Sequence, residues 1–241
     1  MAIYTAFVGC SKKNDPVAPV CYMDTYTYAE DNYSTVDTYT YTNNKITGGS
    51  RSYSTGGVTS YTYNYDAQGR IVSIASTSTR PGSPPSDNQT LTYDANGRVI
   101  QTLSSSEKMV YTYNSSGQMM KREYYTNGSS GFTLNYSWAY TYPSTNTKNY
   151  STQMDYNGSN VLQATLTFVY DTKQNPDAVL VPGSPLTTTN NATQVTFQNP
   201  GSSTSVVTYT YTYNANGFPI TVVEQNSGYI YTKAYSYTNC K

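Results

Sequence analysis

The sequence predicts an all-β protein, an antiparallel meander of roughly fourteen to sixteen strands rolled or closed into a water-soluble, barrel-like sheet. Three observations predict this fold. The 241 residues include 29 tyrosines but only 5 phenylalanines and 1 tryptophan, and tyrosine and threonine favour a pleated, half-buried surface. Tyrosine alternates with threonine in segments such as 38–42 and 208–213, which is the period of a β-strand. The third observation is a short motif that recurs along the chain.

The recurring motif is Tyr-x-Tyr-Asn/Asp-x-x-Gly, and each of its positions has a physical role. Two tyrosines separated by one residue lie on the same face of a strand, and the residue between them faces the other way. Asn or Asp then starts a turn through its side chain, and Gly supplies the positive φ that completes it. Each copy therefore predicts a β-hairpin with a four-residue loop. Clear copies occupy 63–71, 91–99, 111–119 and 211–219, weaker copies occupy 39–46, 154–161 and 168–174, and a half copy occupies 235–240.

A sheet with this many strands has to curl, split or close, and closure removes its exposed edges. Irregular spacing between the copies disfavours a regular solenoid. The longer breaks at 80–87, 182–185 and 199–202 are too short to separate domains, so we expect a single domain over residues 22–241. A closed barrel and an open curled sheet remain the two alternatives.

The N-terminal residues resemble the lipobox of bacterial lipoproteins. The apolar run Phe7-Val8-Gly9 precedes Cys10, and polar residues follow it. The resemblance implies that Cys10 is acylated as the first mature residue, that 1–9 is the remnant of a signal peptide, and that 10–21 forms the anchor and tether. Only nine residues precede Cys10 and none is basic, whereas a complete signal peptide has a basic start and a longer apolar core. We therefore expect a clipped signal peptide; the alternative is a short apolar strand with a buried cysteine.

Two further cysteines lie near the ends of the predicted domain. Cys21 precedes the first strand and Cys240 is the penultimate residue. An exported protein is in a compartment where disulfides persist, so we expect these two thiols to be bridged. Two free thiols are the alternative.

The core Tyr-Asp-x-x-Gly-Arg-Ile/Val of the motif resembles the YD repeat of Rhs-type bacterial surface proteins. Together with Cys10 and the terminal Tyr-x-Tyr-Thr-Asn-Cys, residues 37–240 resemble small Bacteroidota surface lipoproteins of unknown function with a porin-like β fold. The resemblance implies an architecture and an outer-membrane or cell-surface location, but says almost nothing about activity. The chain is too short for the shell that full Rhs proteins build around a toxin.

The amino-acid composition excludes most kinds of catalytic site. The chain has no histidine, which excludes His-activated nucleophiles and imidazole metal ligands, and its three cysteines are too far apart for a sulfur-only zinc site. No phosphate- or dinucleotide-binding motif is present. We therefore expect no enzyme activity, no cofactor and no metal. Equal numbers of acidic and basic residues, 14 each, give no basic footprint for nucleic acid, and membrane contact is expected only through the lipid anchor of a monomer.

The sequence leaves few candidates for a functional site. Most tyrosines belong to the repeat and are expected to form its packing face, whereas Trp138 departs from the repeat; it and Tyr140 are the candidates for ligand binding. The leading hypothesis is a non-catalytic envelope lipoprotein that acts as a binding or structural module, with a glycan or another envelope protein as partner. A carbohydrate-binding accessory protein is the first alternative. A hydrolase that uses the carboxylates of Asp155 and Glu123 is the second, although the charged run 121–123 is expected to be a solvated strand edge.

Overall fold

The computed structural model describes residues 21–30, 32–177 and 188–238. Within these residues the chain forms sixteen β-strands, which confirms the predicted all-β class. Their bounds are β1 Tyr22–Glu30, β2 Tyr33–Thr42, β3 Lys45–Tyr53, β4 Val58–Tyr65, β5 Ile71–Ser78, β6 Ser86–Tyr93, β7 Val99–Leu103, β8 Glu107–Tyr113, β9 Met119–Gly128, β10 Gly131–Thr141, β11 Thr152–Asn157, β12 Leu162–Gln174, β13 Asn190–Gln198, β14 Ser205–Tyr213, β15 Pro219–Asn226 and β16 Tyr229–Thr238. The same ranges contain no helix that is long and apolar enough to cross a membrane.

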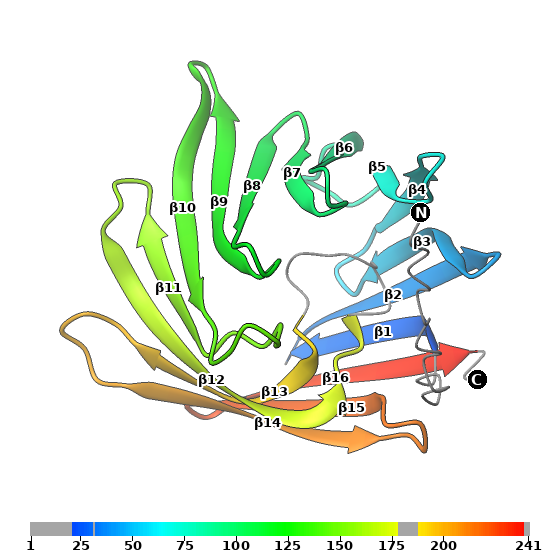
Figure 1. The fold of residues 1–241 in the computed structure, drawn as a ribbon. Helices are drawn as coiled ribbons and strands as arrows, with labels where there is room; N and C mark the ends of the chain where they lie inside the picture. Colours follow the sequence, from blue (N-terminus) through cyan, green and yellow to red (C-terminus); the bar gives the residue numbers. More distant parts are fainter. Residues whose placement is uncertain (1–20, 31, 178–187, 239–241) are drawn as a thin grey trace, which may run out of the picture.

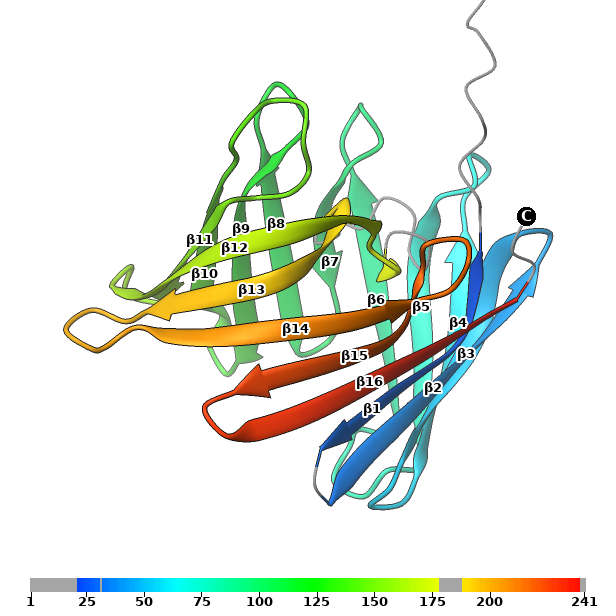
Figure 2. The ribbon, with the colours of Figure 1, turned by 90° about the horizontal axis from the view of Figure 1, so that it is seen from below.

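The strands close into a single antiparallel barrel. Each strand pairs with the strands before and after it in the chain, and β16 pairs with β1 to complete the ring. Figures 1 and 2 show the succession of strands around the ring, with the C-terminal strand beside the N-terminal one. Closure leaves every strand with two neighbours, so no backbone edge is exposed to other chains. The closed barrel is thus the correct one of the two architectures that the sequence left open.

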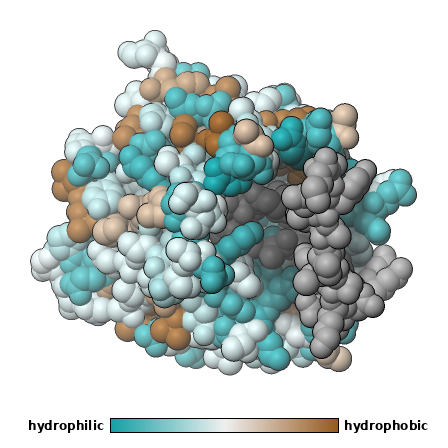
Figure 3. Space-filling model, in the orientation of Figure 1, coloured by the Kyte–Doolittle hydropathy of each residue, from teal (hydrophilic) through white to brown (hydrophobic). Residues whose placement is uncertain are grey.

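The two faces of the barrel differ in chemistry. In β4 the side chains of Tyr61, Tyr63 and Tyr65 are half-buried and point inward, whereas the residues between them are exposed on the outer face. The outer face is rich in threonine and serine, whose hydroxyls pair across strands, as in Thr25 with Ser236 at 2.7 Å. Figure 3 shows a surface of mostly hydrophilic and neutral residues, with apolar residues scattered in small groups. The predicted alternation of tyrosine and threonine therefore separates a tyrosine-lined inside from a hydroxyl-covered outside.

The repeated motif forms hairpin turns at one end of the barrel, which we call the repeat rim (turns 66–70, 94–98, 114–118 and 214–218). In the first of these turns the Gly69 N–H donates to the Asp66 carbonyl at 3.0 Å, with Gly69 at a φ of 79°. The Asp66 carboxylate accepts the Arg70 backbone N–H at 2.8 Å and Arg70 Nε at 2.7 Å. Asp94, Asn114 and Asn214 accept the equivalent backbone N–H in the other three turns. The predicted roles of Asx and Gly are confirmed in these copies.

The second tyrosine of the motif connects most copies to the preceding part of the sheet; in copy 211–219 it is Tyr213, which donates to the Asp171 carboxylate instead. The hydroxyl of Tyr93 donates to the Ile71 carbonyl at 2.6 Å, and the Arg70 guanidinium lies 4.6 Å from the centre of its ring. Tyr113 repeats both contacts one hairpin later, with the Val99 carbonyl and with Arg98. The same kind of hydroxyl-to-carbonyl bond is made by Tyr41, Tyr65, Tyr142, Tyr170 and Tyr237. The repeated spacing of the motif therefore supports contacts between neighbouring hairpins as well as the turn itself.

The three weaker copies of the motif differ in outcome. Copy 154–161 forms the predicted turn, with the Val161 N–H donating to Asn157 Oδ1 at 2.9 Å and Asn160 at positive φ in place of the glycine, but at the opposite end of the barrel, the far rim. Copy 39–46 is a hairpin that turns through only two residues, Asn43 and Asn44, both at positive φ. Copy 168–174 was predicted to turn and does not, because β12 continues through Gln174. The last two copies lack a residue at positive φ in the glycine position of the motif, so the local signal for a four-residue turn is incomplete.

The two ends of the domain meet at the seam between β1 and β16. Tyr22 pairs with Thr238, and the fully buried Cys21 is disulfide-bonded. The other two cysteines, Cys10 and Cys240, lie outside the described residues, as do the predicted signal remnant at 1–9 and most of the predicted tether. The register places Cys21 one residue before Tyr22, and Cys240 follows Thr238 by two residues in the sequence. The pairing of Cys21 with Cys240 stays a prediction that this register favours.

Candidate functional site

Trp138 lies on the inner face of the barrel between two opposite charges. It pairs directly with Arg122 of β9 on one side and with Asp155 of β11 on the other. Residues that pair directly have neighbouring side chains on one face of a sheet, so an arginine, a tryptophan and an aspartate form a row across three strands. Trp138 is half-buried, as are Arg122 and Asp155.

The aromatic surface of this row extends toward the far rim. Tyr136 follows the same inner face of β10, with its ring 6.2 Å from that of Trp138, and Tyr124 of β9 stacks on Tyr136 at 6.5 Å. Tyr136 is 51 % exposed. The Tyr124 hydroxyl donates to Glu107 at 2.7 Å, which fixes its ring in place. We call Tyr124, Tyr136, Trp138, Arg122 and Asp155 the inner strip.

Arg122 is held by stacking rather than by an ion pair. Its guanidinium carbon lies 3.8 Å from the centre of the Trp138 ring, a close cation–π contact. Its Nε is buried and has no hydrogen-bond partner among the described residues. A buried donor without a partner is costly, because desolvation of the polar group is not compensated. Arg122 is therefore the residue of the inner strip whose hydrogen bonding is incomplete.

Asp155 occupies the other end of the row. Its Oδ1 accepts a hydrogen bond from Gln153 Nε2 at 2.8 Å. Burial raises the pKa of the Asp155 carboxyl, while the bond from Gln153 and the charge of Arg122 oppose that rise. An ionised carboxylate can accept hydrogen bonds through both oxygens, so Oδ2 can accept one from the hydroxyl of a ligand.

The strip ends at a closed core on the side of the repeat rim. Tyr140, the next inward residue of β10, is only 2 % exposed and packs with Val99, Tyr111 and Met119. Tyr150, in the loop between β10 and β11, places its ring 4.9 Å from that of Tyr140. Exposure along β10 thus falls from Tyr136 through Trp138 to Tyr140, so the strip is accessible from the far rim. Of the two residues suggested for ligand binding, Trp138 lies in the strip, whereas the enclosed position of Tyr140 favours a packing role.

We expect Tyr140→Ala to lower the free energy of unfolding by about 3 to 5 kcal/mol, because it removes a large ring from a packed core and leaves a cavity. Tyr136→Ala is the matched control on the same strand and face, and it should cost less than about 1 kcal/mol because half of that ring is already exposed. Urea unfolding followed by circular dichroism measures both variants. Equal losses in the two variants would contradict the assignment of Tyr140 to the core.

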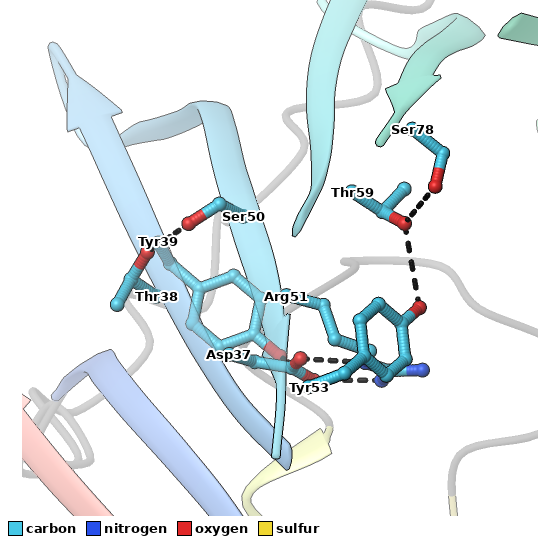
Figure 4. A network of polar contacts seen from close by, with 8 residues as sticks. All are labelled: Asp37, Thr38, Tyr39, Ser50, Arg51, Tyr53, Thr59 and Ser78. Atoms are coloured by element: carbon cyan, nitrogen blue, oxygen red, sulfur yellow. Dashed lines mark hydrogen bonds and ion pairs between the residues drawn. The ribbon is translucent and has the colours of Figure 1, made fainter. Parts of the chain in front are cut away.

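Two other inner-face cations are paired with carboxylates. Arg51 of β3 makes two bonds to the buried carboxylate of Asp37, at 2.6 and 2.7 Å. Figure 4 shows this pair between Tyr39 and Tyr53, with Thr38 and Ser50 on the opposite side of the same hairpin. Lys233 lies 3.2 Å from Glu224 on the neighbouring strand β15. These pairs satisfy their own charges, in contrast to Arg122.

The charged run at 121–123 was expected to be a solvated strand edge, and that prediction is wrong for its central residue. A β-bulge after Met119 turns Arg122 inward, opposite Tyr111, whereas Lys121 and Glu123 face outward and pair with each other at 2.7 Å. The suggested carboxylates Asp155 and Glu123 consequently lie on opposite faces of the sheet. The structure does not bring this candidate pair together.

The structure also has a hollow near the repeat rim. It has a volume of about 320 Å³ and is lined by Asn114, Gln118, Met120, Thr141, Tyr142, Ser144 and Thr145. Its central amide, Gln118 Nε2, already donates to the carbonyls of Ser144 and Thr147, at 2.7 Å each. The hollow is therefore a consequence of the hydrogen bonds that attach the loop after β10 to Gln118. Across the described ranges, no three Cys, Asp or Glu side chains cluster as a metal site.

Comparison with known proteins gives likenesses of fold only. No family model and no curated protein matches the sequence. Among solved structures, a porin-like protein from Bacteroides uniformis ATCC 8492 has 12 % identity and a TM-score of 0.43, covering 90 % of this chain and 96 % of that one. A porin-like protein from Bacteroides vulgatus ATCC 8482 has 11 % identity and a TM-score of 0.29, covering 91 % and 99 %. At these levels of similarity no functional argument rests on either protein.

Proposed function

We propose that this chain is a non-catalytic binding module of the bacterial cell envelope, and that its inner strip binds a saccharide. The observation that carries the proposal is the half-exposed row of Tyr136 and Trp138 flanked by Arg122 and Asp155. Ligand sites typically combine aromatic surface with a few polar groups that fix orientation. The row has both, and it is accessible from one end of the barrel.

A sugar matches the strip in two respects. The C–H face of a pyranose ring packs against an aromatic ring, and the tyrosines of the strip offer rigid rings with little rotational freedom to lose. Hydroxyls of the sugar can donate to the Asp155 carboxylate and accept from the Arg122 guanidinium. The repeat tyrosines at the repeat rim are not part of this site, because their hydroxyls bond to neighbouring carbonyls.

The envelope location is supported by the outer face and the cysteines. The hydroxyl-rich outer face suits water, since lipid-facing strands carry an outward apolar band. The disulfide-bonded Cys21 suits an oxidising compartment outside the cytoplasm. We propose that Cys10 carries a lipid anchor, that the hairpins are YD-like repeats, and that the protein acts as a monomer without catalysis.

Binding to an array of oligosaccharides, followed by calorimetry on those retained, tests the saccharide proposal. Trp138→Ala should abolish binding, because it removes the central ring and the platform on which Arg122 stacks. Tyr156→Ala is the matched control, an aromatic on the outer face of the adjacent strand β11. Unchanged binding in Trp138→Ala, or no binding by the unmodified protein to any saccharide, would contradict the proposal.

A further inference from the structure

Arg122 differs from Arg51 and Lys233, two cations on the inner face of the barrel that are paired with carboxylates. Arg51 and Lys233 each have a carboxylate within 4 Å, whereas the ion pairs found in the described ranges do not include Arg122. Arg122 instead stacks on Trp138 and keeps a buried Nε without a hydrogen-bond partner in those ranges. The inner strip thus carries a fixed positive charge whose counter-charge the described residues do not supply at bonding distance.

Stacking orients the guanidinium for an external anion. The cation–π contact uses the flat face of the group, while its N–H donors point outward in the plane of the group. A planar carboxylate is the natural complement, because its two oxygens accept two parallel N–H bonds from an arginine. Because Trp138 holds the guanidinium in position, little side-chain freedom is lost when such a ligand binds.

The residues around Arg122 restrict the kind of ligand that can carry this carboxylate. Asp155, two strands from Arg122 in the same row, disfavours a ligand with negative charge along its whole length. The exposed ring of Tyr136 and the adjoining ring of Trp138 favour a flat, partly apolar body. The combination fits a ring with one acidic substituent at one side and neutral hydroxyls at the other.

We propose that the inner strip is specific for an acidic saccharide whose carboxylate is bound by Arg122 and whose hydroxyls are bound by Asp155. This inference rests on the proposed saccharide-binding function and specifies its ligand class. A uronic acid unit in an oligosaccharide has the required ring, carboxylate and hydroxyls.

The test compares uronate-containing oligosaccharides with their carboxyl-reduced counterparts, which differ only in carrying an alcohol in place of the acid. The full chain should bind at least one acidic oligosaccharide roughly tenfold to a hundredfold more tightly than its reduced form, as expected for a hydrogen-bonded charge. Arg122→Gln should remove this preference, and Arg122→Lys should retain only part of it, because lysine keeps the charge without the planar fork. Lys121→Gln is the matched control: it makes the same charge change one residue earlier, on the outer face, and should leave the preference intact.

The outcomes separate the two levels of the proposal. Equal binding of acidic and reduced forms, or preference for the reduced form, would overturn the acidic ligand and leave saccharide binding in place. Absence of binding to every saccharide would overturn both. Circular dichroism and thermal unfolding of the Arg122 variants establish that they fold, and an acid preference that survives in folded Arg122→Gln would also overturn the role of Arg122.

Discussion

Raising the pH above about 10 is expected to unfold this protein cooperatively, because its inner tyrosines keep their protons in the barrel and lose them in the unfolded chain. Burial raises the pKa of Tyr63, Tyr142 and Tyr209 to about 12, and it raises the pKa of Tyr39 and Tyr235 further. A phenol with a raised pKa in the folded state binds more protons there than in the unfolded chain. The stability it contributes is complete below the ordinary pKa of about 10 and is lost as the pH rises toward the raised values.

The size of this effect follows from the number of tyrosines involved. If only five tyrosines stay protonated in the barrel and ionise in the unfolded chain, the free energy of unfolding falls by about 7 kcal/mol per pH unit above pH 10. A domain of this kind has a total stability of about 5 to 15 kcal/mol, so unfolding should be complete within one or two pH units.

Tyrosinate absorbance and far-ultraviolet circular dichroism, recorded on the same samples, measure this transition. We expect the two signals to change together. Tyr235→Phe should raise the midpoint pH, because it removes one of the linked protons, and the same change at Tyr229, which is 60 % exposed, should leave the midpoint in place. Ionisation of most tyrosines near pH 10 with the barrel intact would contradict the buried state of the inner rings.

Replacing Cys21 with serine is expected to lower the free energy of unfolding by about 5 kcal/mol, because a bridge to Cys240 would close a loop of more than two hundred residues. The bridge would lie beside the pairing of Tyr22 with Thr238, where the last strand meets the first. Without it, the seam depends on strand pairing and side-chain packing alone.

Urea unfolding of Cys21→Ser, Cys240→Ser and Cys10→Ser identifies the bonded pair. The free energy of unfolding should fall by the same amount in the first two variants and should not change in Cys10→Ser. Peptide mapping under non-reducing conditions gives the pairing directly. A bridge from Cys21 to Cys10 would close a loop of only about ten residues, so the loss would be nearer 3 kcal/mol and would appear in Cys10→Ser instead.

The amino-acid sequence was sufficient to predict the fold class, the approximate strand number and the hairpins at 66–70, 94–98, 114–118 and 214–218. These features depend on local chemistry: alternation places tyrosines on one face, Asx side chains bond to the next turn residues, and glycine adopts a positive φ. It also singled out Trp138, because that residue interrupts the repeat. It did not reveal that the second tyrosine and the arginine after the glycine connect neighbouring hairpins, since that contact joins residues about twenty positions apart.

Closure of the barrel and the composition of the inner strip depend on contacts between distant parts of the chain and became clear only from the three-dimensional structure. Closure depends on pairing between β1 and β16, which lie at opposite ends of the sequence. The inward position of Arg122 depends on a bulge: regular pairing from Tyr113 and Met119 would place Lys121 opposite Tyr111, and the extra residue Met120 places Arg122 there instead. One inserted residue exchanges the two faces of a strand, and for this reason the charged run that was predicted to be solvated contributes its central residue to the inside of the barrel.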